Sequence, residues 1–88
     1  MSGAEFPKNA RPLVDALLAA GWSFMVAHGK DTGSSPYVSV EGKGPDSEVK
    51  CTWHTRGTGT YRLFTSIVRL PGRAWHDATL KKVLEVIA

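Results

Sequence analysis

Apolar residues recur at helical spacing near both ends of the chain. The first stripe consists of Leu13, Val14, Leu17 and Leu18. Asn9 can cap this helix and Gly21 suits a left-handed C-terminal position, so we expect a helix over about 10–20. The last stripe consists of Leu80, Val83, Leu84 and Ile87. Asp77 is a good N-cap for this second helix, so the pattern predicts one amphipathic helix at each end.

Between these helices, apolar and polar residues alternate with the period of two that is typical of strands. We expect strands over 22–28, 36–41, 49–56 and 60–68. In the third strand the apolar positions are Val49, Cys51 and Trp53, and the polar positions are Lys50, Thr52, His54 and Arg56. The segment 60–68 also fits a short helix by spacing, but its β-branched and aromatic residues favour a strand.

The turn between the third and fourth strands decides which side chains share a face. A two-residue loop would mix apolar and polar residues on both faces, whereas a three-residue loop over 57–59 keeps one face apolar. We therefore expect Arg56 to pair with Thr60. The further pairs in this register are Trp53 with Leu63, His54 with Arg62, Cys51 with Thr65, Thr52 with Phe64, and Lys50 with Ser66.

Both helices must bury their apolar stripes, and the apolar face of the sheet offers the surface for this. We therefore expect one α+β domain of order α-β-β-β-β-α, with both helices packed on one face of an antiparallel sheet. Residues 9–88 would form this domain and residues 1–8 a flexible tail.

Composition places the chain in a reducing compartment. The single cysteine, Cys51, rules out a disulfide within the chain and is expected to be inert in the core. No apolar run has the roughly 20 residues that span a bilayer, and the N-terminal segment lacks the pattern of a signal peptide. We expect a cytoplasmic protein with no membrane partner.

Charge is distributed unevenly along the chain. Residues 1–49 carry four lysines and arginines against six carboxylates, whereas residues 50–88 carry seven against two. The free sheet face would carry Lys50, Thr52, His54, Arg56, Arg62, Phe64 and Ser66. Such a face, with three fixed cations, one aromatic ring and no carboxylate, suits phosphate contacts and a stacked base. A sheet with one solvated side is the alternative interpretation.

Two further groups of residues are candidates for binding. Lys81 and Lys82 lie near the start of the last helix, where helix N-termini favour phosphate; solvated lysines are the alternative. Trp75 and Arg73 lie in a connector, and a tryptophan exposed beside basic residues can anchor a partner protein.

The histidines His28, His54 and His76 lack the spacing of metal ligands, so we expect no metal and no cofactor. His54 beside Arg62 could act as a general base toward an RNA 2′-hydroxyl, with the arginine stabilising charge on the phosphate.

The order of elements over residues 11–88 resembles the layout of HicA-type toxins. The resemblance is carried by LVDALLAAGW and HDATLKKVLEVIA, in which Gly21-Trp22 ends the first helix and Thr79-Leu80 opens the last. It implies a fold similar to double-stranded-RNA-binding domains, and mRNA cleavage by a histidine that follows Gly-Ser in the first hairpin. This chain departs from that motif, because it has His28-Gly29-Lys30 there, and the resemblance would make His28 a displaced equivalent of that histidine. The middle segment, TWHTRGTGTYRLF, resembles small proteins of actinobacterial phages and implies a phage accessory protein in a bacterial host.

Three functions are compatible with these features. The favoured one is a non-catalytic nucleic-acid-binding module, for RNA or DNA, that uses the basic sheet face with help from the helical lysines. The second is a HicA-like ribonuclease that uses His54 or His28. The third is a phage protein that binds a host protein through Trp75, Arg73 or an exposed strand edge. A homodimer is compatible with all three.

Overall fold

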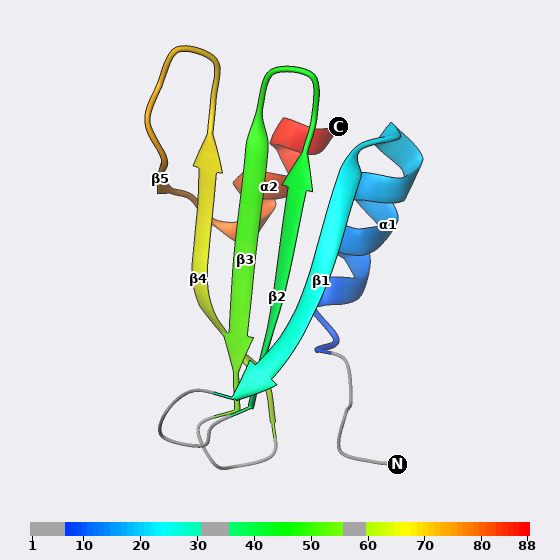
Figure 1. Ribbon diagram of the computed structural model, residues 1–88, viewed down its shortest axis with the longest axis vertical. Helices are drawn as coiled ribbons and strands as arrows, with labels where there is room; N and C mark the ends of the chain where they lie inside the picture. The colour runs from blue at the N-terminus through cyan, green and yellow to red at the C-terminus, as the bar shows by residue number, and fades with distance from the viewer. Residues whose placement is uncertain (1–6, 31–35, 56–59) are drawn as a thin grey trace.

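The computed structural model describes residues 7–30, 36–55 and 60–88 (Figure 1). Its helices and strands are α1 (Ala10–Ala20), β1 (Ser23–Lys30), β2 (Pro36–Lys43), β3 (Glu48–His54), β4 (Arg62–Arg69), β5 (His76–Asp77) and α2 (Leu80–Ile87). The strands form one antiparallel sheet in the order β1-β2-β3-β4-β5. The expected α+β fold is therefore confirmed, with the short β5 added at one edge of the sheet.

Helix α1 has the predicted bounds, and it ends at Gly21 in the left-handed conformation (φ 73°). Its buried residues are Ala10, Leu13 and Leu17. Leu18 was expected to belong to this stripe, but its side chain is 63% exposed. The buried stripe of α1 is thus narrower than the sequence indicates.

Helix α2 begins later than predicted. The expected N-cap, Asp77, lies instead in β5, where it pairs with Ile67. Thr79 is the N-cap, and its Oγ1 accepts a hydrogen bond from the backbone N–H of Lys82 at 3.1 Å. Aspartate and threonine both cap helices well, but residues 76–77 pair with β4, so the helix can begin only after them.

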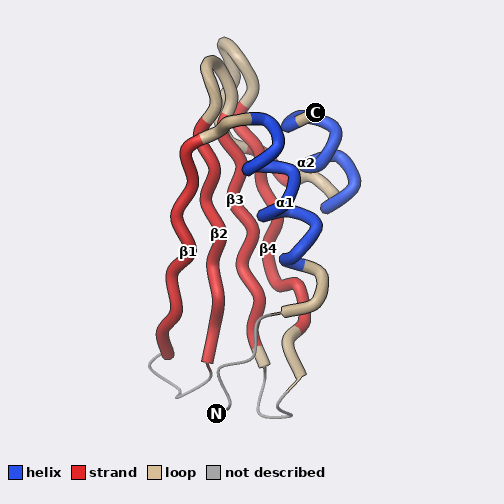
Figure 2. The backbone as a smooth tube through the Cα atoms, turned by 90° about the vertical axis from the view of Figure 1, so that its right-hand side faces the viewer, coloured by secondary structure: helices blue, strands red, loops and turns tan. Residues whose placement is uncertain are grey.

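Both helices cover the same face of the sheet, as Figure 2 shows. The core between the two layers is fully buried and includes Leu13, Leu17, Val40, Val49, Cys51, Trp53, Val68 and Val83. Gly42 of β2 lies directly beneath Leu17, so that α1 sits close to β2. None of the described helices covers the other face of the sheet, which we call the open face.

The β3–β4 register agrees with the prediction only near the loop. Trp53 pairs with Leu63 and His54 with Arg62, as expected. The turn itself, with Arg56 and residues 57–59, lies outside the described residues. A register shift between Thr52 and Trp53 then changes the remaining pairs, which are Thr52 with Thr65, Cys51 with Ser66, Lys50 with Ile67 and Val49 with Val68. The predicted pairs of Thr52 with Phe64, Cys51 with Thr65 and Lys50 with Ser66 are therefore wrong.

Candidate nucleic-acid interface

The open face is built from four rows of neighbouring residues that run across β1, β2, β3 and β4. The rows are Ser23, Lys43, Glu48 and Arg69; Met25, Glu41, Lys50 and Ile67; Ala27, Ser39, Thr52 and Thr65; and Gly29, Tyr37, His54 and Arg62. Paired residues of neighbouring strands point to the same side of a sheet, so each row shares this face. The first and last rows lie at opposite ends of the face and differ in chemistry.

Three residues of the last row, Tyr37, His54 and Arg62, form with Phe64 what we call the aromatic end. The rings of Tyr37 and His54 lie 5.9 Å apart between their centroids. The rings of His54 and Phe64 lie 4.7 Å apart and meet edge to face, a favoured arrangement of aromatic pairs. A hollow of about 230 Å³ opens here, lined by His54, Arg62, Leu63 and Phe64. Three aromatic rings and one guanidinium thus share one corner of the open face.

Phe64 owes its position to a β-bulge. The register shift places Phe64 between Leu63, which pairs with Trp53, and Thr65, which pairs with Thr52. A bulge adds one unpaired residue to a strand and bends it. As a result the Phe64 ring is 58% exposed, and Thr65 beside it is exposed as well.

The same bulge moves Ser66 off the open face. Ser66 pairs with buried Cys51, and the thiol Sγ lies 3.6 Å from the serine Oγ. Burial raises the pKa of the Cys51 thiol, although the hydrogen bond with Ser66 opposes this shift. The assignment of Ser66 to the free face is therefore wrong, whereas the expectation of a buried Cys51 is confirmed.

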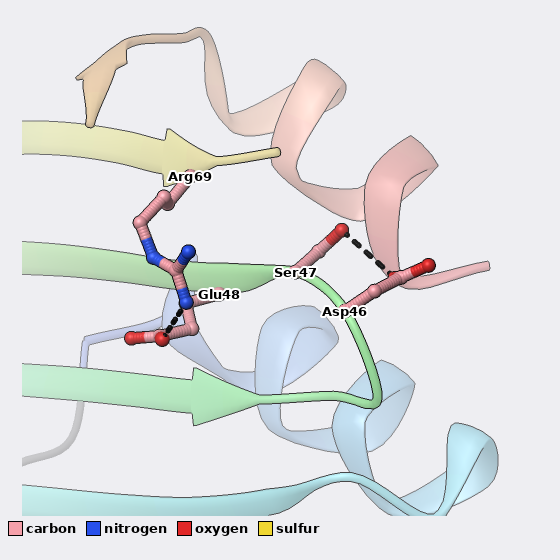
Figure 3. Close-up of polar contacts among 4 residues, drawn as sticks. All are labelled: Asp46, Ser47, Glu48 and Arg69. Carbon is pink, nitrogen blue, oxygen red and sulfur yellow. Dashed lines mark hydrogen bonds and ion pairs between the residues drawn. The ribbon is translucent and has the colours of Figure 1, made fainter. Parts of the chain in front are cut away.

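The opposite end of the open face is a mixed charge cluster. Arg69 donates to the carboxylate of Glu48 in an ion pair (Figure 3). This hydrogen bond lowers the pKa of Glu48, and the charges of Arg69 and Lys43 add to the effect. Glu41 lies opposite Lys50 in the next row. The expectation of a face without carboxylates is thus wrong, because β2 contributes Glu41 and β3 begins with Glu48.

The structure separates the remaining candidate residues from the aromatic end. Lys50 lies four residues from His54 along β3, about 13 Å at the usual strand rise. Lys81 and Lys82 are exposed on α2, in the helical layer on the other side of the sheet. Arg73 is exposed and Trp75 is 39% exposed in the connector between β4 and β5, so the expected exposure of Trp75 is confirmed.

The two candidate catalytic histidines lie on opposite faces. His28 pairs with Val38, whose side chain is buried and has the parity of core residue Val40, whereas His54 pairs with Tyr37 on the open face. They cannot act on one substrate atom together. Within the described residues there is no group of three histidine, cysteine, aspartate or glutamate side chains that could hold a metal ion. No helix in the described ranges has the length and apolarity needed to cross a membrane.

Tyr37 is the site residue that the sequence did not identify. It lies at the start of β2, and its place beside His54 depends on the register in which β2 pairs with β3. The only available signal was an aromatic residue after Pro36, at the solvent-facing parity of a strand whose Val38 and Val40 face the core.

Comparison of the chain with protein-family models, with curated protein sequences and with solved structures finds no match.

Proposed function

We propose that the protein binds single-stranded nucleic acid without catalysis, by stacking a base on Phe64 and contacting a neighbouring phosphate through Arg62. The observation that carries this proposal is the exposed ring of Phe64 packed edge-on against His54, next to a guanidinium on the same face. A large aromatic side chain with more than half of its surface exposed is costly to hydrate unless a ligand covers it.

The shape of the surface favours a single strand over a duplex. Bases in a duplex are stacked on one another and offer only their edges in the grooves. Aromatic rings that project from a sheet need an unstacked base, as single strands provide. Tyr37, His54 and Phe64 lie close enough together for successive bases of one strand to contact them.

The charges favour weak, salt-dependent binding without sequence readout. Arg62 lies opposite His54 on the neighbouring strand, and the row that contains them, Gly29, Tyr37, His54 and Arg62, includes no carboxylate. Lys50 is farther away and faces Glu41, so its contribution to phosphate binding is smaller. The lysines of α2 and the connector residues Arg73 and Trp75 lie outside this proposed site.

The expected setting is the cytoplasm of a bacterial host cell.

Binding can be tested by fluorescence anisotropy with labelled single-stranded DNA and RNA at low salt. Phe64→Ala should weaken binding by about 1–3 kcal/mol, the usual value of one base–aromatic stack. That range corresponds to a Kd increase between roughly 5-fold and 150-fold. Trp75→Ala removes an exposed aromatic outside the proposed site and should leave the Kd unchanged.

Salt dependence provides a second and independent readout. Each phosphate contact on a single strand contributes about 0.7 to the slope of log K against log salt. Arg62→Gln should lower this slope by about that amount, whereas Lys81→Gln removes the same charge from the helical layer and should not change it.

Three results would overturn the proposal: no binding to either nucleic acid at low salt, equal affinity for single strands and duplexes, or full binding by Phe64→Ala. Cleavage products that disappear in His54→Ala would instead favour the ribonuclease. Loss of binding in Trp75→Ala alone would move the site to the connector.

A further inference from the structure

Strand β1 forms one edge of the sheet. Its eight residues pair with β2 from Ser23 to Lys30 without a register shift, so the strand is regular along its whole length. No described strand pairs with its outer side. An edge of this kind presents a row of backbone donors and acceptors that can pair with another strand.

The β1 edge lacks the features that usually prevent such pairing. It contains no proline and no bulge, and its only lysine is the last residue, Lys30. The opposite edge differs, because β4 carries the bulge at Phe64 and β5 covers Ile67 and Val68. There the backbone N–H of Ala78 also donates to the carbonyl of Ser66 at 2.9 Å. Within the part of the chain that the structure describes, one edge of the sheet is thus protected and the other is not.

Apolar side chains flank the β1 edge on both sides of the sheet. Met25 is 60% exposed on the open face. Phe24 and Val26 lie on the helical side but remain only half-buried, because α1 packs over β2. Leu18 is exposed on α1, the helix that leads into β1 and lies on the β1 side of the molecule (Figure 1). A partner on this edge would cover apolar surface on both faces.

We propose that the β1 edge is the interface of a homodimer, in which β1 of a second copy pairs antiparallel to it around a two-fold axis. A two-fold interface uses the same patch on both subunits, so the patch must complement itself. The centre of β1, Phe24-Met25-Val26-Ala27, carries no formal charge, and an antiparallel partner places the two Lys30 residues at opposite ends. A strongly charged partner strand would find no opposite charge along this centre.

The parity of β1 restricts the register to pairings centred on a residue. Both helical layers lie on the same side of the joined sheet only if paired residues face the same side. Pairing centred on Val26 meets this condition and joins residues 23–29 of the two copies. It places Met25 beside Ala27 of the second copy on the open face, so that a large side chain meets a small one. The dimer would have one continuous ten-stranded sheet, since each copy contributes five strands.

Sedimentation equilibrium of the whole chain tests this proposal without any nucleic acid. One copy has a mass of 9.5 kDa, and the dimer should appear as the concentration rises. Interfaces below about 1,200 Å² are weak, so the concentration series should extend to about 100 µM and beyond. A chain that remains monomeric throughout the series would overturn the proposal.

Charge placement tests the register itself. Met25→Lys with Ala27→Lys puts two pairs of like charges directly opposite each other, and should raise the dimer dissociation constant by about ten-fold or more. Met25→Lys with Ala27→Glu puts opposite charges in the same two pairs, and should restore the dimer. Thr65→Lys lies at the far end of the Ala27 row and should leave dimerisation unchanged.

Equal dissociation constants for the Lys/Lys and Lys/Glu variants would show that these residues do not face each other. Dissociation by Thr65→Lys to the same extent would show a general charge effect. Either result would overturn the proposed interface, and both leave the nucleic-acid proposal untouched because that proposal concerns the aromatic end.

Discussion

Gly42 of β2 lies against Leu17 of α1, and we expect its replacement by alanine to weaken the packing of this helix on the sheet. A Cβ atom added at Gly42 would lie 2.5 Å from Leu17 Cδ2 and 3.2 Å from Val49 Cγ2. Both neighbours are fully buried in the core between the helices and the sheet, so the added methyl group must be accommodated by repacking. Only Gly21 and Gly72 among the described glycines have positive φ, so the substitution probes packing rather than backbone strain.

The magnitude follows from two opposing effects. Forcing a methyl group into a packed core costs about 1–3 kcal/mol. Replacing glycine by alanine also restricts the unfolded chain, which returns about 0.4–1 kcal/mol. At the midpoints of these ranges, Gly42→Ala should lower the free energy of unfolding by about 1.3 kcal/mol, and by no more than about 2.6 kcal/mol. Glu41→Ala, at the exposed neighbouring position, should change it by less than about 0.5 kcal/mol.

A double-mutant cycle makes this test specific. Leu17→Ala alone should cost about 2–5 kcal/mol, because it leaves a cavity at the place where the added methyl group would fit. The double variant should be more stable than the sum of the single effects by about 0.5–3 kcal/mol. Urea unfolding followed by tryptophan fluorescence measures all four proteins, with buried Trp53 as the main probe. A neutral Gly42→Ala, or additive effects, would refute the packing of α1 on β2.

Two further predictions concern local features of the fold. Thr79→Ala should lower the free energy of unfolding by about 1 kcal/mol, because it removes the side chain that caps α2. Asp77→Ala should lower it by less than about 0.5 kcal/mol. If urea unfolding shows the larger loss for Asp77→Ala, then Asp77 and not Thr79 is the cap. The pKa of Glu48 should lie below its usual range, so the stability contributed by its ion pair is present above the unfolded pKa and is lost as pH falls through the folded pKa. Arg69→Gln should raise this pKa toward its usual range in an NMR titration, and an unchanged pKa would mean that the ion pair is absent in solution.

Periodicity alone predicted most of the fold. Two helices over one face of a sheet were indicated by the apolar stripes Leu13–Leu17 and Val83–Ile87 and by the alternation in 49–56. The structure has the two helices and the sheet, with a shared core between them. These signals are local, because each depends on residues only a few positions apart. The solvent-facing parity of β3 followed for the same reason.

The parts that could not be predicted depend on pairing between distant segments. The bulge at Phe64 has no signature in the alternation, because Leu63-Phe64-Thr65-Ser66 can alternate in either parity. Tyr37 reaches His54 only through the β2–β3 register, and Glu41 reaches Lys50 in the same way. Strand β5 consists of two residues, which is too short to produce a periodic pattern. Consequently the candidate site has Arg62 as its main cation, where the sequence predicted Lys50, Arg56 and Arg62 together. It also contains one aromatic residue, Tyr37, that the sequence analysis did not include.

The central claim is that the aromatic end of the open face contacts single-stranded nucleic acid. Amide chemical-shift mapping by NMR, with a short unlabelled oligonucleotide added to the isotope-labelled protein, tests it most directly. We expect the largest shifts at Tyr37, His54, Arg62 and Phe64, with small changes in α2. Shifts confined to Lys81 and Lys82, or to the connector around Trp75, would contradict it.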